Sequence, residues 1–233
     1  TDDLPRRYHA MKCASLLRDI PIPSALAEVI GSVVKGPLFP VHYEELVDPL
    51  YCVTRSPDLQ PARVLAARLF EQLRVPSAID PNPLWTLGCE SAEWALHICE
   101  CERLSARMRA HAVVASLLHP LGAMLVARYA PEAGCADDEA HLKDSELHYA
   151  SVASYTLALW GFPNEVVEAV AFHLIPDRNQ PSVLGAVTVT HVACSIARSL
   201  CEGDSPTSAV DLQHLERLGL KRRLVSWLEA RLR

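Results

Sequence analysis

The sequence predicts an all-α fold. Half of its 233 residues are hydrophobic but only 6% are aromatic, so a core of mainly Leu, Ala and Val is expected, which favours helices over a β-sandwich. The nine glycines are few for a turn-rich β protein. The seventeen prolines cluster between apolar stretches rather than within them, as expected of residues that separate helices.

Helical patterns occupy four stretches in the first part of the chain, at residues 8–18, 25–34, 43–53 and 59–73. Prolines and glycines separate these stretches, and Ser24 is a candidate N-cap for the second of them. The segment at residues 78–83 holds two prolines, an Asp and an Asn, and is the strongest breaker in the sequence. We therefore expect an N-terminal helical subdomain over residues 1–83.

A second group of helices is expected after this breaker, at residues 84–104, 107–126, 149–160, 165–174 and 183–201, with a surface loop at 131–138 and Asn164 as a cap. These helices define a second subdomain at residues 84–203. The remainder, 204–233, is predicted to be a helical extension. Its apolar side chains form one stripe that can dock on a helical body, namely Leu220, Leu224, Trp227, Leu228 and Leu232.

Charge and cysteine content restrict the class of protein. The net charge of −6, with both signs interspersed, argues against a surface dedicated to nucleic acid. The basic cluster of the terminal helix, namely Lys221, Arg222, Arg223, Arg231 and Arg233, is interpreted as a solvated helix face. No uninterrupted apolar stretch approaches the roughly 20 residues of a membrane span. Eight cysteines without disulfide-framework spacing fit a reducing compartment, so we expect a cytoplasmic protein with no membrane partner.

Four histidines of the second group could assemble a metal site if the tertiary fold brought them together: His119, His148, His173 and His191. Imidazole is a common ligand of catalytic transition metals. Taken singly, each of these residues is better explained as a packed or surface histidine. No phosphate-binding glycine loop or nucleophile elbow occurs in the sequence.

The segments around these histidines resemble the HDOD family, the HD-related output domains of bacterial signalling proteins. "LLHPLGAMLVARYAPE" resembles the family's "LLHDIGKLVL…YPE", and "AVTVTHVACSIA" resembles the closing "LVHLADALA". The stretch from Ser145 to Asp177 resembles the part of the family in which a Trp-Gly-Phe/Leu-Pro turn precedes "EAIxxHH". "IPIPSALAEVI" and "YEELVDPLYCVTRSPDLQPARVLAARLF" are similar to the N-terminal helices that distinguish HDOD from other HD proteins. The resemblance implies a two-subdomain helical bundle with an HD-type helical core in the second half.

The resemblance also shows which metal-site residues are missing. In the hydrolytic relatives, a His-Asp pair holds a metal that hydrolyses phosphate esters. Here His119 is followed by Pro120, the second His of the usual pair is Leu174, and the closing Asp is Cys194. The opening His corresponds to Glu90 without a gap, or to Leu87 after a small shift. His148 and His173 match. The carboxylates that hold hard cations are thus absent, and we expect no metal and no other cofactor.

Pro120 is also predicted to affect the backbone. A proline within a helix removes one hydrogen-bond donor and disfavours the αR conformation for the preceding residue, so we expect a kink that re-aims His119. A residual site of His119, His148 and His173, with Glu90 as a possible carboxylate ligand, stays open as an alternative for a softer metal such as zinc.

The resemblance implies a non-catalytic signal-transduction module that acts through protein–protein contact, linked to two-component or cyclic-di-GMP pathways. Its partners are expected to be signalling proteins, with a nucleotide as a conceivable ligand. The expected working surface is the groove between the subdomains, bordered by Trp85, Glu90, His119, His148 and His173. Two alternatives are an atypical metal-dependent phosphohydrolase of the HD superfamily and a nucleotide-binding sensor.

Overall fold

The computed structural model describes residues 81–129, 139–160 and 162–232, with side chains described for 83–129, 149–160 and 162–231. All regular elements in this part of the chain are helices, which confirms the all-α class there. They are α5 (Pro81–Cys101), α6 (Ala106–Leu118), α7 (Leu121–Tyr129), α8 (Glu139–Leu159), α9 (Asn164–Phe172), the 3₁₀ helix η2 (Pro176–Asn179), α10 (Ala186–Glu202), α11 (Leu212–Arg217) and α12 (Lys221–Leu232). The predicted helices at residues 8–73 and the loop at 131–138 lie outside the described residues.

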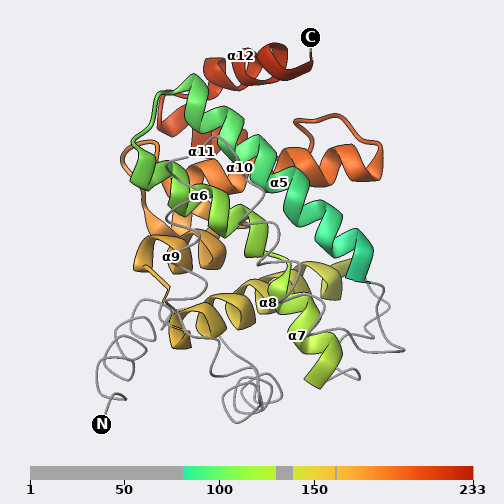
Figure 1. Ribbon diagram of the computed structural model, residues 1–233. Helices are drawn as coiled ribbons and strands as arrows, with labels where there is room; N and C mark the ends of the chain where they lie inside the picture. The colour runs from blue at the N-terminus through green and yellow to red at the C-terminus, as the bar shows by residue number, and fades with distance from the viewer. Residues whose placement is uncertain (1–80, 130–138, 161, 233) are drawn as a thin grey trace, which may run out of the picture.

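Helix α10 is the centre of the packing, because it contacts α5, α6 and α9. Helix α8 packs on α7 and α9 at the other end of the molecule, and α12 lies across the end of α5 (Figure 1). The largest fully buried side chains come from several of these helices and include Trp94, Ile98, Leu117, Leu157 and Ile196. The apolar faces that the sequence pattern predicted therefore meet in one core.

The single helix predicted at residues 107–126 is wrong, because the structure divides it into α6 and α7 at His119 and Pro120. Pro120 has no N–H to donate to the carbonyl of Ser116, so the helical ladder is interrupted there. The prediction that residue 119 leaves the αR region is also wrong, since His119 has φ −57° and ψ −30°. The break therefore comes from the lost donor and not from an extended residue before the proline.

Several helix ends differ from the prediction for local reasons. Helix α5 begins at Pro81 and ends at Cys101, and the Ser105 side chain then caps α6 by accepting a hydrogen bond from the N–H of Met108 at 3.2 Å. The predicted cap Asn164 instead lies in the first turn of α9, whose N-cap is Pro163. The ring of Pro163 fixes its φ angle at a value that suits the residue before a helix. No side-chain hydrogen bond caps this end of α9.

The C-terminal extension forms two helices instead of one. Gly219 ends α11 with φ +70°, a left-handed conformation that favours glycine. The N–H of Leu220 then donates to the carbonyl of Leu215 at 2.8 Å. Leu220, directly before α12, and Leu224 and Trp227 on α12 are buried, so three of the five residues of the predicted stripe face the body of the domain.

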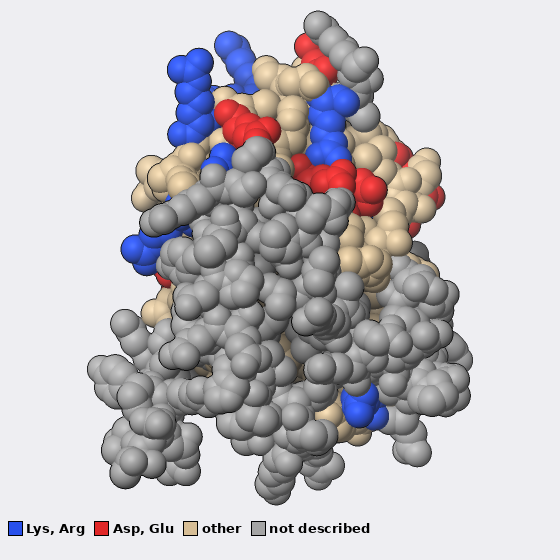
Figure 2. All heavy atoms as spheres, in the orientation of Figure 1, with Lys and Arg blue, Asp and Glu red and all other residues tan. Residues whose placement is uncertain are grey.

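Trp227 anchors α12 on α5. Its indole N–H donates to the Glu102 carboxylate at 2.9 Å, and its carbonyl accepts from His97 Nε2 at 2.9 Å. Arg223 pairs with Glu102, and Arg231 pairs with Glu93 at 2.8 Å. Figure 2 shows acidic and basic side chains close together at this end of the molecule. Two residues of the basic cluster, Arg223 and Arg231, thus form ion pairs with acidic residues near α5. Ion pairs of this kind at a surface stabilise a fold only slightly.

One stretch of the described chain, Ala106–Tyr129, is long and apolar enough to cross a membrane by length and composition. Charged and polar side chains interrupt this stretch, Arg107, Arg109 and His111 among them. In the structure 94% of its most apolar window is buried inside the fold, and the stretch is broken at Pro120. Core helices of globular domains pass the same test.

Two glycines allow close helix contacts around this break. A Cβ atom on Gly88 would lie 2.6 Å from the carbonyl oxygen of Leu117, where α5 meets α6. A Cβ atom on Gly122 would lie 1.8 Å from the carbonyl oxygen of Tyr149, where α7 meets α8. Both contacts are with backbone, which cannot move aside as the end of a flexible side chain can. These positions therefore set how closely the helices approach.

We predict that Gly122→Ala forces α7 away from α8 and lowers the free energy of unfolding by about 1–3 kcal/mol, the usual cost of overpacking. Urea denaturation followed by circular dichroism measures the change. Gly185→Ser is the matched control, because the nearest atom to a Cβ there is 3.9 Å away and serine suits the N-cap of α10. Equal stability of Gly122→Ala and the wild type would refute the close contact.

Candidate functional site

A cavity of about 720 Å³ lies where the start of α5 meets the α6–α7 break, α8 and the ends of α9 and α10. Its volume lies within the range of small-molecule pockets. Most of the described residues that line it are apolar, with two histidines and one arginine among them: Pro83, Leu84, Thr86, Leu87, His119, Pro120, Ala123, Tyr149, Ala150, His173, Leu174, Arg198, Cys201 and Glu202.

His119 is held by the helix break itself. In a continuous helix, the carbonyl of Ser116 would accept a hydrogen bond from the N–H of residue 120. Pro120 has no such donor, and the Nδ1 atom of His119 lies 2.8 Å from that carbonyl oxygen instead. Since a carbonyl only accepts, Nδ1 carries the proton. The Nε2 atom of His119 is buried and has no partner among the described residues.

His173 repeats this arrangement at the end of α9. It is the C-cap residue of α9, as His119 is of α6, and its Nδ1 donates to the carbonyl of Val170 at 2.8 Å. The two imidazole rings meet edge to face, with centroids 5.1 Å apart. The structure thus brings together two of the histidines that the sequence singled out, and both line the cavity.

Both imidazoles are neutral at physiological pH. Burial lowers the pKa of His119 to about 4, and the positive charge of Arg198 acts in the same direction. Burial also holds the pKa of His173 well below its ordinary value, and the neighbouring His119 adds to this effect. With Nδ1 protonated and the ring neutral, Nε2 of each histidine is a hydrogen-bond acceptor or a metal ligand and not a donor.

The donor set does not fit the binuclear metal site of an HD hydrolase. Pro120 offers no ligand, and Leu87 rather than Glu90 lines the cavity at the position of the opening His. Cys194 is buried, burial raises the pKa of its thiol to about 12, and it does not line the cavity. Within the described residues, no group of three or more His, Cys, Asp or Glu side chains is placed to hold a metal.

The remaining predicted site residues lie elsewhere or outside the described part. Helix α8 carries His148, but its side chain is not among those described, so the three-histidine site stays a prediction. Trp85 packs against the core without lining the cavity. The charge of Glu90 acts on Cys201 and Arg231, toward the end of α10 and α12.

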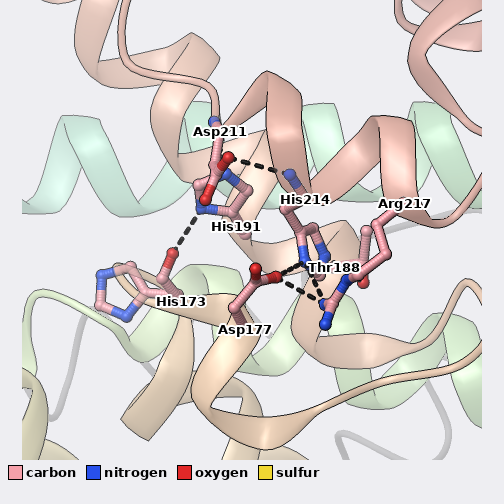
Figure 3. A network of polar contacts seen from close by, with 7 residues as sticks. All are labelled: His173, Asp177, Thr188, His191, Asp211, His214 and Arg217. Carbon is pink, nitrogen blue, oxygen red and sulfur yellow. Dashed lines mark hydrogen bonds and ion pairs between the residues drawn. The ribbon is translucent and has the colours of Figure 1, made fainter.

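His191, the fourth predicted histidine, holds His173 from behind and does not line the cavity. Its Nδ1 donates to the carbonyl of His173 at 2.6 Å, and its Nε2 accepts from the N–H of Asp211 at 2.9 Å (Figure 3). Burial lowers its pKa, which fits a neutral ring with one donor and one acceptor nitrogen. The His173 backbone is thereby tied to the chain that leads into α11.

A second imidazole continues this network into α11 (Figure 3). His214 is completely buried; its Nδ1 lies 2.5 Å from the Asp177 carboxylate and its Nε2 lies 3.0 Å from the Thr188 hydroxyl. Arg217 donates to the same oxygen of Asp177 at 2.6 Å. Asp211 caps α11 by accepting from the N–H of His214 at 2.9 Å. These contacts fasten the C-terminal extension to α10 and η2.

Arg198 lines the cavity, although no sequence pattern singled it out. It lies one helical turn after Cys194 on α10, so the periodicity of a helix places it near the face expected for the closing Asp. A cation near this position opposes metal binding as well as imidazole protonation, because both bring positive charge.

Comparison with known proteins agrees with this architecture. The family model of the HDOD domain matches residues 63–176. A crystal structure from Shewanella amazonensis SB2B, named "putative phosphohydrolase", is similar with a TM-score of 0.51, covers 94% of this chain and 93% of that chain, and shares 14% sequence identity. At this identity the likeness concerns the fold alone. No curated protein matches the sequence.

We predict an acid-sensitive stability that depends on His119. Between the ordinary histidine pKa of 6.5 and the folded value of about 4, the unfolded chain binds a proton that the folded chain excludes. The free energy of unfolding should therefore be fully retained above pH 6.5 and fall as the pH drops through this window, by up to about 3 kcal/mol from this group.

His119→Asn should reduce this pH dependence, because the Asn amide N–H can still reach the Ser116 carbonyl but does not titrate. The buried His173 and His191, whose pKa values are also lowered, should account for the dependence that is left. Denaturant unfolding at a series of pH values gives the slope of the free energy of unfolding against pH for the wild type and for the variant. A loss of stability that is the same at every pH leaves this slope unchanged. An identical slope in the wild type and the variant would contradict the burial of a neutral His119.

Proposed function

We propose that this chain, which the HDOD family model matches over residues 63–176, is a non-catalytic signal-transduction module acting by protein–protein contact. The proposed setting is bacterial two-component or cyclic-di-GMP signalling in the cytoplasm, with other signalling proteins as partners. The HD-type helical core would serve as the scaffold of this module. The residues that line the cavity are the reason to propose that it does not cut phosphate esters.

One observation carries the proposal: the cavity keeps two histidines of the HD site, His119 and His173, while the positions that supply carboxylates hold other residues. Hydrolysis by a metal requires the ion to be held rigidly so that it can activate water. The described lining of the cavity holds two neutral imidazoles, the cation of Arg198 and the carboxylate of Glu202 in an exposed residue. Such a set is poorly suited to hold two hard cations in place.

A metal-dependent phosphohydrolase remains the second candidate, and one observation favours it. His119 and His173 both have the neutral tautomer that ligates metals through Nε2. His148, on α8, would have to supply the third ligand. The similar structure from Shewanella amazonensis SB2B bears the name of such an enzyme, although the likeness to it is one of fold.

We predict that the purified full chain hydrolyses neither bis(p-nitrophenyl) phosphate nor cyclic-di-GMP in the presence of Mn²⁺. Any background release of p-nitrophenol should be the same for the wild type and for His119→Asn, because no metal-bound water is generated at this site. A rate in the wild type that is abolished in both His119→Asn and His173→Asn would contradict the proposal and support the enzyme.

A further inference from the structure

Two neutral imidazoles line the cavity, whereas a phosphate-binding site would present hydrogen-bond donors. Nδ1 of His119 and Nδ1 of His173 each donate to a backbone carbonyl, so neither can turn toward a ligand without losing that bond. The remaining nitrogen of each neutral ring carries a lone pair. Both rings are at least nine-tenths buried.

Nε2 of His119 requires an explanation of its own. It is one of six buried side-chain atoms without a hydrogen-bond partner among the described residues, and of these six residues His119 is the one that lines the cavity. Burying such an atom unpaired costs free energy. The ring to which it belongs lines a cavity large enough for a small molecule. A donor group on a bound molecule would satisfy this nitrogen.

The side chains around the two rings restrict the polarity of the rest of the ligand. Leu84, Leu87, Pro120 and Leu174 give the cavity an apolar lining close to the histidines. Apolar walls favour a ligand with a largely apolar body through the hydrophobic effect. A phosphate ester would gain attraction from Arg198, but its oxygens would face the lone pairs of the imidazoles without a proton between them.

We propose that this cavity binds a small, uncharged, mostly apolar molecule that donates one N–H or O–H to the imidazole pair, with Nε2 of His119 as the acceptor. Heteroaromatic amines, phenols and primary amides belong to this class. The inference rests on the proposed function, because it assumes that the site performs no metal chemistry and names the ligand that such a site can bind. It makes the module a sensor of small molecules.

Indole and benzofuran are suitable probes, because the two molecules have nearly the same shape and only indole has an N–H. Titration calorimetry on the full chain gives both dissociation constants. Since the two probes differ in hydrophobicity, the measured quantity is the ratio of their dissociation constants in the wild type compared with the ratio in His119→Asn. We expect the preference for indole to fall by roughly 2- to 10-fold in the variant, because the net free energy of one neutral hydrogen bond corresponds to a change of this size in a dissociation constant.

Cys201→Ser is the matched control, since Cys201 also lines the cavity but is exposed and plays no part in the proposed recognition. It should keep the wild-type preference. As a readout that does not depend on folding of the variant, indole should shift the ¹⁵N resonance of His119 Nε2 in the wild-type chain labelled at histidine, and benzofuran should shift it less.

Absence of indole binding, an equal preference in the wild type and His119→Asn, or displacement of indole by inorganic phosphate would each overturn this inference. None of these results depends on phosphate-ester hydrolysis. Failure of the ligand assignment can therefore be distinguished from failure of the proposed non-catalytic function, which the hydrolysis assay tests.

Discussion

The hydrogen bond between His119 Nδ1 and the Ser116 carbonyl is the interaction on which the site depends. It exists because Pro120 cannot supply the N–H that this carbonyl would accept in a continuous helix. One substitution in the His-Asp pair thus has two effects. It removes a carboxylate ligand, and it ends α6 so that the preceding imidazole is fixed in one tautomer beside the cavity.

The surrounding packing keeps this arrangement in place. Gly122 lets α7 approach α8 closely directly after the break, and Gly88 does the same for α5 and α6. His173 is held from the other side by His191, which connects its carbonyl to Asp211 and the C-terminal helices. The two cavity histidines are therefore part of the folded framework, and a ligand would meet them already oriented.

Much of this could be predicted from residue patterns, and the failures have physical causes. The low aromatic content and the placement of the prolines predict the helical class, and the HDOD family model matches residues 63–176, as the resemblance leads one to expect. The pairing of His119 with His173 depends on the tertiary fold, which no spacing along the chain reveals. Glu90 was a candidate because an ungapped count placed it at the opening position, but Leu87, on a neighbouring face of the same helix, lines the cavity. The αR conformation of His119 shows that helix packing and the new side-chain bond outweigh the local preference before proline.

The proposed function requires a cavity that keeps His119 and His173 but cannot hold hard cations. Titration of the full chain into Mn²⁺, followed by electron paramagnetic resonance, tests this directly because protein-bound Mn²⁺ loses most of the signal of the free ion. The account predicts that the signal of free Mn²⁺ persists and is the same for the wild type and His119→Asn. Stoichiometric loss of the signal in the wild type, restored by His119→Asn, would contradict it.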